Sequence, residues 1–270
     1  MRPLRPEDLP WLAELHNDAF ADYPLPAALD ASTLGFYMDE TSVRADTSHV
    51  AFADGEPVSF CLGAARGRRA SIRGEGTARA HRRRGLGSQV LEATLQSLRA
   101  AGADEARLEV LDGNAAAIRL YERYGFRRHR RLLGFSMLRP RVGRLRRRSG
   151  RDLSDIEAEA AVARVAEWGW PDPPWQLEPE SLLHLPAYAH GDGAVVIGKR
   201  RGTRFWLYAL SVDPSGRRVG AATRALASLP IASISLPALL PQEWAGARAF
   251  LNALHATPEH YGQWDMRREL

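Results

Sequence analysis

The chain of 270 residues has a single cysteine, Cys61, and a single lysine, Lys199. One cysteine excludes a disulfide framework and a cysteine-rich zinc site, and the eight histidines show no metal-ligand spacing, so no metal is expected. No apolar run approaches the length of a membrane span, and the first residues enter a charged amphipathic segment rather than a signal peptide. The sequence therefore predicts a cytoplasmic protein with no membrane contact.

Aromatic residues are nearly missing from the part of the chain that is richest in positive charge. Between Arg127 and Arg151 there are eleven arginines and no acidic residue, although the whole chain carries a net charge of only +5. Such a run can indicate a nucleic-acid site, but base stacking needs aromatic rings and only Phe135 lies within it. The sequence favours a solvated strand face followed by an interdomain linker.

The most informative segment is a glycine-containing turn at residues 82–88, which reads Arg-Arg-Arg-Gly-Leu-Gly-Ser. Its two glycines allow a tight bend, and the residues that follow have helical apolar spacing, so unpaired N–H groups at a helix start would face an anion. The third glycine of a dinucleotide loop is replaced by Val90, and a Walker lysine is absent. The turn predicts a pyrophosphate site, with a basic surface turn as the alternative.

A second motif joins a strand to a helix farther along the chain. Asn114 is placed to cap this helix and Gly125 to end it. Asn114 and Tyr121 are seven residues apart, so two helical turns place them on the same side. A core aromatic with its hydroxyl at the surface is the alternative for Tyr121.

Together, and in this order, the two motifs resemble the acyl-CoA site of the GNAT superfamily of N-acyltransferases. The resemblance implies acetyl-CoA as co-substrate, with the first motif on its pyrophosphate, the Asn114 region on the pantetheine arm and Tyr121 near the sulfur. It also implies an oxyanion site formed by backbone N–H groups at the strand bend near Thr77 and Ala78. The cofactor-binding residues expected from it are Thr77, Ala78, Arg82, Arg83, Arg84, Gly85, Leu86, Gly87, Ser88, Asn114, Ala117 and Tyr121.

The expected reaction is direct transfer of an acetyl group to a primary amine of a small molecule or peptide (EC 2.3.1 type). A thiol has a pKa of about 8.5 and a phenol about 10, so Tyr121 is the candidate general acid. Glu75, on the strand before the turn, is the candidate base, with a solvated strand-face carboxylate as the alternative. A non-catalytic acyl-CoA-binding regulator is the alternative function, and a homodimer is left open.

The order of expected elements predicts an α/β fold, a GNAT-like mixed sheet flanked by helices, in two tandem modules. Residues 1–140 would form the catalytic domain, 141–154 an arginine-rich linker and 155–270 a degenerate GNAT-like domain. One elaborated domain is the alternative.

The second module repeats the glycine turn as Arg217-x-x-Gly220-x-Ala222. Aligning the helices that follow places Trp244 at the position of Asn114 and Leu251 at that of Tyr121. The second module is therefore expected to keep the fold and to lack the polar pair.

Overall fold

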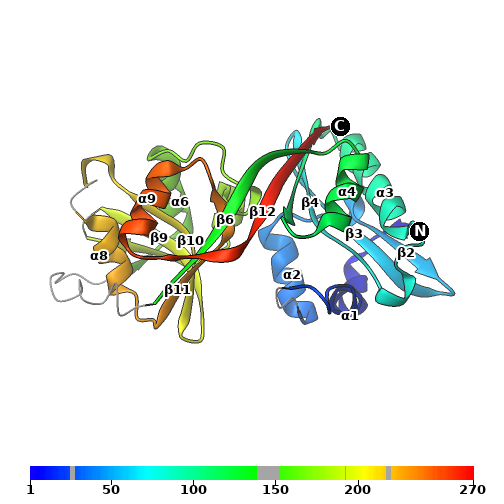
Figure 1. The fold of residues 1–270 in the computed structure, drawn as a ribbon, viewed down its shortest axis with the longest axis horizontal. Helices are drawn as coiled ribbons and strands as arrows, with labels where there is room; N and C mark the ends of the chain where they lie inside the picture. The colour runs from blue at the N-terminus through cyan, green and yellow to red at the C-terminus, as the bar shows by residue number, and fades with distance from the viewer. Residues whose placement is uncertain (25–27, 139–152, 192, 217–219) are drawn as a thin grey trace. The chain divides into compact units, whose positions relative to one another are not determined.

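The computed structural model describes residues 1–24, 28–138, 153–191, 193–216 and 220–270. Most of the expected linker, 141–152, and Arg217 lie outside the described residues, whereas Leu153 and Ser154 begin a strand. The chain divides into two compact units (Figure 1). Unit 1 contains Met1–Val110, Asn114–His129 and Trp264–Leu270, and unit 2 contains Leu111–Gly113 and Arg130–Gln263.

In unit 1 the strands are ordered β1-β2-β3-β4-β5-β12-β6, and only the end of β12 and the start of β6 belong to this unit. Neighbours from β1 to β4 are antiparallel, and β4 pairs with β5 in parallel. The bounds are β1 Arg2–Pro3, β2 His49–Ala53, β3 Glu56–Arg66, β4 Arg69–Thr77, β5 Glu105–Leu111, β6 Arg127–Leu138 and β12 Thr257–Glu269.

Two pairs of helices cover the two faces of the unit 1 strands (Figure 1). Helices α1 (Leu9–Ala19) and α2 (Ala31–Glu40) cover one face, and α3 (Leu86–Ala100) and α4 (Ala115–Arg123) cover the other. The apolar spacing expected for α3 is confirmed, because its apolar residues are buried together against the strands. Short 3-10 helices are η1 Pro6–Asp8, η2 Ala45–Thr47, η3 Arg79–His81, η5 Trp175–Leu177 and η6 Pro214–Gly216.

Residues 264–270 complete unit 1, although they lie outside the domain that the sequence predicts at residues 1–140. The end of β12 lies beside β5, and the backbone N–H of Leu270 donates to the carbonyl of Asp104 at 2.9 Å. Met266 is fully buried in the same core as the apolar face of α3. The sheet of unit 1 therefore takes one of its strands from the end of the sequence.

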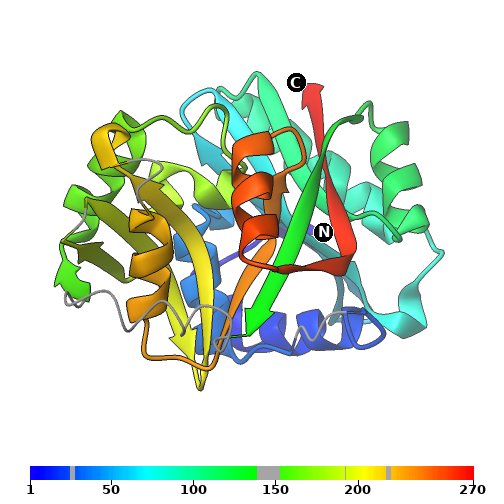
Figure 2. The ribbon, with the colours of Figure 1, turned by 60° about the vertical axis from the view of Figure 1, so that its left-hand side comes forward.

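Unit 2 has the strand order β12-β6-β11-β10-β9-β8-β7, and its helices again lie on two faces. Figure 2 shows α8 and α9 on one face, and residues of α6 and α7 share a separate core with β9. None of the described helices is long and apolar enough to cross a membrane. The bounds are β7 Leu153–Ile156, β8 Ala187–His190, β9 Ala194–Arg201, β10 Arg204–Val212, β11 Ser233–Pro241, α6 Ala158–Glu167, α7 Pro179–Leu182, α8 Ala221–Ser228 and α9 Ala245–Ala253.

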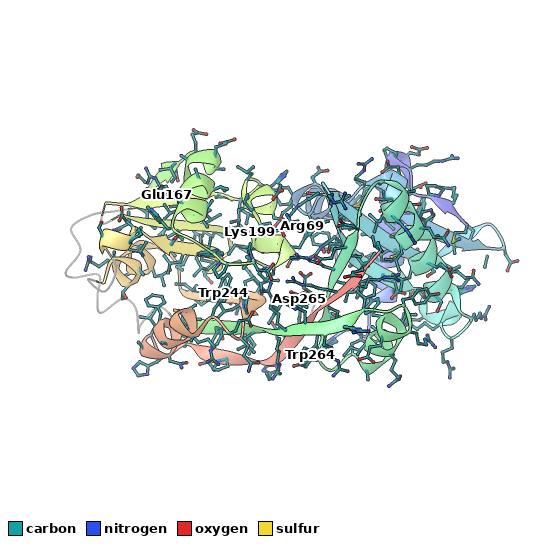
Figure 3. The ribbon with its side chains drawn as sticks, turned by 90° about the horizontal axis from the view of Figure 1, so that it is seen from above. Arg69, Glu167, Lys199, Trp244, Trp264 and Asp265 are labelled. Carbon is teal, nitrogen blue, oxygen red and sulfur yellow. The ribbon has the colours of Figure 1, made fainter. Side chains whose placement is uncertain are left out.

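The described part of the arginine run lies on β6, and Arg128 and Arg130 have partners within their own units. Arg128 pairs with Glu122 at 3.1 Å and lies over the ring of Trp264, which Figure 3 labels. In unit 2, Arg130 is buried and pairs with Asp172 at 3.2 Å. The strand part of the run thus forms ion pairs within each unit, and Arg130 is buried rather than on the solvated strand face that the sequence favours.

Candidate active site

A separation of two neighbouring strands creates the candidate site in unit 1. β4 and β5 pair in parallel only from Arg69 and Glu105 to Ile72 and Leu108. Both strands continue, β4 to Thr77, but they form no further pairs with each other along their described lengths. Backbone N–H and C=O groups that face this opening lack a ladder partner, so they are available to a ligand.

A bulge in β4 aims Glu75 at the start of α3. The register of β3 and β4 shifts so that Arg73 is an extra residue, and a bulge reverses the alternation of side chains that follows it. Ile72 lies in the core beneath α3, and beyond the bulge Glu75 faces the same helix. A Cβ atom placed on Gly87 would lie only 2.5 Å from Glu75 Oε1. Glycine at position 87 therefore makes room for this carboxylate.

The glycine turn has the geometry of an anion site. Gly85 has φ +79° in the left-handed region, and it begins α3 without a side-chain cap. Gln89 is the first residue whose N–H bonds back to the turn, to the Gly85 carbonyl at 3.1 Å. The N–H groups of the three residues between them have no acceptor within the helix, and they lie at its positive end. These residues are Leu86, Gly87 and Ser88, which the sequence motif also names.

The three arginines of the turn differ in their surroundings. The Arg82 guanidinium makes two hydrogen bonds to Asp22, at 2.6 and 2.8 Å, and one to the Ala19 carbonyl at 2.8 Å. It ties the turn to the end of α1, so in this structure it orders the turn. Arg83 and Arg84 are exposed beside the start of α3.

Tyr121 and Glu75 meet within the opening. The Tyr121 hydroxyl, on the buried face of α4, donates a hydrogen bond to Glu75 Oε2 at 3.4 Å. Burial raises the pKa of Glu75 to about 7, against the opposing effect of this hydrogen bond. Burial and then the Glu75 charge raise the pKa of Tyr121 well above its usual value. At neutral pH the Tyr121 phenol therefore keeps its proton, whereas the Glu75 carboxyl group is close to its pKa and can gain or lose a proton.

Asn114 has the capping role that the sequence predicts. Its Oδ1 accepts a hydrogen bond from the Ala117 N–H at 3.2 Å, and Gly125 ends α4 with φ +80°. Tyr124, which the sequence motifs do not single out as a site residue, donates through its hydroxyl to the Ser88 carbonyl at 3.0 Å. This bond fixes the end of α4 to the first turn of α3.

The two amides expected to hold an oxyanion are not equivalent. The Ala78 N–H donates to the Val58 carbonyl at 2.9 Å, so it belongs to the β3–β4 ladder and is not free for a ligand. In an antiparallel ladder, this bond makes the adjacent Ser59–Thr77 pair non-hydrogen-bonded. The Thr77 N–H therefore points to the opposite edge of β4, toward the opening. Of these two amides, only the Thr77 N–H points toward the opening.

A buried ion pair that the sequence does not reveal lies where β4 and β5 separate. Arg73 on β4 pairs with Glu109 on β5, and their side chains are 3% and 6% exposed. The Tyr37 hydroxyl from α2 donates to the Arg73 carbonyl at 2.7 Å. Both strands carry other charged residues, so the sequence does not single out this pair. The pair holds the two strands together at the last point before they diverge.

Cys61 lies opposite Glu75 in the β3–β4 register and is fully buried. Burial, followed by the charge of Glu75, raises the pKa of the thiol, so the thiolate is disfavoured. This agrees with a cysteine that packs and does not react. Among the described residues no three His, Cys, Asp or Glu side chains are grouped as metal ligands.

Solved structures with this fold span the whole chain. A putative acetyltransferase from Pyrococcus horikoshii is 18% identical with a TM-score of 0.72, covering 100% of this chain and 88% of that one. A GCN5-related N-acetyltransferase from Sphaerobacter thermophilus is 15% identical with a TM-score of 0.69, covering 99% and 94%. A tandem GNAT protein from the clavulanic acid biosynthesis pathway is 13% identical with a TM-score of 0.69, covering 99% and 97%. These likenesses confirm the expected tandem α/β fold.

The family comparison covers the residues that build the opening. No curated protein sequence matches the chain. The model of the acetyltransferase (GNAT) family matches residues 11–126, which include β4, the glycine turn and all of α4. Residues 11–126 therefore belong to the GNAT family of acetyltransferases, within a chain that has the fold of tandem GNAT proteins.

Proposed function

We propose that unit 1 transfers an acetyl group from acetyl-CoA to a primary amine of a small molecule or peptide. The observation that carries the proposal is the buried Tyr121–Glu75 hydrogen bond beside the start of α3. It combines a phenol that keeps its proton with a carboxyl group that titrates near neutral pH. An acyl transfer between a thioester and an amine requires a proton donor and a proton acceptor of this kind.

The co-substrate would be held mainly by backbone groups. The N–H groups of Leu86, Gly87 and Ser88 would bind the pyrophosphate, with Arg83 and Arg84 adding positive charge. When bound, acetyl-CoA supplies the reactive thioester. The Thr77 N–H faces the opening and would donate to the oxygen of the thioester carbonyl as negative charge develops on it.

The proton transfers balance without a covalent enzyme intermediate. An amine of pKa near 10 is only about 0.1% neutral at pH 7, so the ammonium form first releases one proton to solvent and the neutral form reacts. The neutral nitrogen attacks the carbonyl carbon, the new N–C bond forms, and the C–S bond breaks. Glu75 accepts the proton that the nitrogen loses, and Tyr121 gives its proton to the departing sulfur. The hydrogen bond between them returns the proton to Tyr121, leaving the amide and free CoA thiol.

The proposal is tested by thiol release across a panel of small and peptide amines, with acetyl-CoA affinity measured by calorimetry. We expect Tyr121→Phe and Glu75→Gln to lower turnover by about 10²–10⁴-fold with little change in affinity. Tyr188→Phe removes a phenol from unit 2 and is the matched control. Acetyl-CoA binding without thiol release on any amine would favour a non-catalytic acyl-CoA-binding protein.

The same assay tests whether the base is Glu75 or Glu109, the other carboxylate at the opening. Glu109 is ion-paired with Arg73, whereas Glu75 bonds to the proposed acid. If Glu109→Gln abolished the pH dependence of the rate and Glu75→Gln left it intact, Glu109 would be the base.

A further inference from the structure

Unit 2 repeats the strand separation that forms the opening in unit 1. β10 pairs with β11 in parallel only from Arg204 and Ser233 to Trp206 and Ser235, and both strands then continue. The register of β9 and β10 shifts around Tyr208, as that of β3 and β4 shifts around Arg73. The same backbone device therefore occurs twice in the chain.

The start of α8 also repeats the start of α3. Gly220 has φ +83° and begins α8 without a side-chain cap, and the Arg224 N–H is bonded back to the Gly220 carbonyl at 3.0 Å. Equivalent positions in the two units have the same offset from the bulge residue, Arg73 or Tyr208, or from the glycine that precedes the helix. Leu210 takes the place of Glu75, and Ala222 that of Gly87.

Apolar side chains replace the reacting groups in unit 2. Leu251 stands at the position of Tyr121, so the proposed base and acid are both aliphatic here. Trp244, labelled in Figure 3, begins α9 at the position of the capping Asn114. The positions equivalent to Glu75 and Tyr121 therefore carry no group that can donate or accept the protons of acyl transfer, although the bulge residue Tyr208 lines the same cavity.

The side chains that the structure describes nevertheless do not fill the opening in unit 2. It contains a cavity of about 350 Å³, lined by Leu210, Ala222, Trp244 and Leu251 among others. No Asp, Glu, Lys, Arg or His is among the described residues that line it. Trp170 and Trp244 form part of the wall, with their rings edge to face at 5.3 Å. The wall is thus almost wholly apolar.

We propose that this cavity is a binding site for an uncharged aliphatic chain of medium length. The lining side chains offer a charged group no ionic partner, whereas an apolar chain gains by leaving water. An apolar cavity of about 150 Å³ holds one six-carbon ring, so the larger volume holds roughly a dozen carbons. The acetyl-CoA reaction of unit 1 is not part of this proposal.

The shape of the lining favours a chain over a compact ring system. Lining residues run along β10 from Leu207 to Val212 and along β11 from Leu236 to Leu240. Five residues of a strand extend over about 16 Å, so the space is long relative to its volume. An apolar space that extends along two strands accommodates an unbranched chain.

The test is calorimetric titration of the full chain, without acetyl-CoA, with 1-hexanol, 1-octanol and 1-decanol below their aggregation limits. We expect the affinity to rise by about fourfold for each added methylene until the cavity is filled. Decanoate, which has a similar length but a charged head, should bind at least about tenfold more weakly than 1-decanol. Affinity that is independent of chain length, or equal for acid and alcohol, would overturn the proposal.

Substitutions on α9 locate the site. Ala247 lines the cavity, and Ala249 is exposed on the same helix outside it. Ala247→Phe should abolish alcohol binding, while Ala249→Phe should leave it unchanged. If Ala247→Phe does not fold, Ala247→Leu should lower the affinity and shift the best ligand to a shorter chain. Binding that survives filling of the cavity would overturn the proposal.

Two further measurements distinguish alcohol binding in unit 2 from the proposed chemistry of unit 1 and from self-association of the chain. Tyr121→Phe should bind 1-decanol as the parent does, so failure of the enzymatic proposal leaves this result intact. If the apolar face instead contacts a second copy of the chain, sedimentation would show a dimer that Ala247→Phe alters and 1-decanol does not dissociate. That outcome would also overturn the proposal.

Discussion

Replacing Glu75 by glutamine should remove a pH-dependent loss of stability from unit 1. Burial raises the Glu75 pKa from 4.5 to about 7, so between these values the unfolded chain ionises while the folded chain keeps its proton. Stability therefore falls as pH rises from about 4.5 through about 7 and is constant above that range. At 1.36 kcal/mol per pKa unit, the loss is up to ~3 kcal/mol. Glu75→Gln has no proton to lose, so its stability advantage over the parent should grow across this range.

Differential scanning calorimetry between pH 4 and pH 8.5 measures this difference. At roughly 2–4 °C per kcal/mol, the melting temperature of Glu75→Gln should gain about 6–12 °C on the parent from the acid end to the alkaline end. The relevant transition is the one that acetyl-CoA shifts, because a ligand stabilises the unit that binds it. Glu14→Gln removes an exposed carboxylate from α1 and should track the parent at every pH. A constant difference between Glu75→Gln and the parent would refute the buried-carboxyl assignment.

Three other substitutions at the same opening should have measurable effects. Arg73→Met leaves the Glu109 carboxylate buried without its partner and should lower the free energy of unfolding by about 3–5 kcal/mol, measured by thermal or urea denaturation. Gly87→Ala places a methyl group against Glu75, so thiol release should fall by roughly tenfold or more at an unchanged melting temperature. Gly85→Val forces a β-branched residue to φ +79°, and calorimetry should show acetyl-CoA affinity reduced by about tenfold. In the parent, kcat/KM should rise with pH through about 7 as Glu75 loses its proton, and a flat profile would contradict the base role.

Local features of the site were predictable because each depends on residues close in sequence. Two glycines before an apolar repeat predicted a tight turn at a helix start, and α3 begins there after Gly85, whose backbone is left-handed. Asn114 and Gly125 predicted the two ends of α4 by capping rules alone. The repeat of these signals in the second half predicted the second module, with its apolar replacements.

Features that depend on pairing between distant residues were not predictable. The β4 bulge at Arg73 exists only relative to β3, so the sequence of β4 alone does not reveal which side Glu75 faces. The Arg73–Glu109 pair joins two strands that are separated in sequence by the whole of α3. The engagement of the Ala78 amide with Val58 likewise follows from register, so the sequence alone does not distinguish Thr77 from Ala78.

The place of β12 in the sheet affects when unit 1 can finish folding during synthesis. Met266 and Leu270 occupy the core and the sheet of unit 1, and Arg268 bonds to the Tyr124 carbonyl at 2.5 Å, beside the helix that carries the proposed acid. When a ribosome has translated every other part of unit 1, this edge of its sheet is still bare. Unit 1 must therefore wait for residues 264–270 before its sheet is complete, so a truncation within unit 2 would also leave unit 1 unfinished.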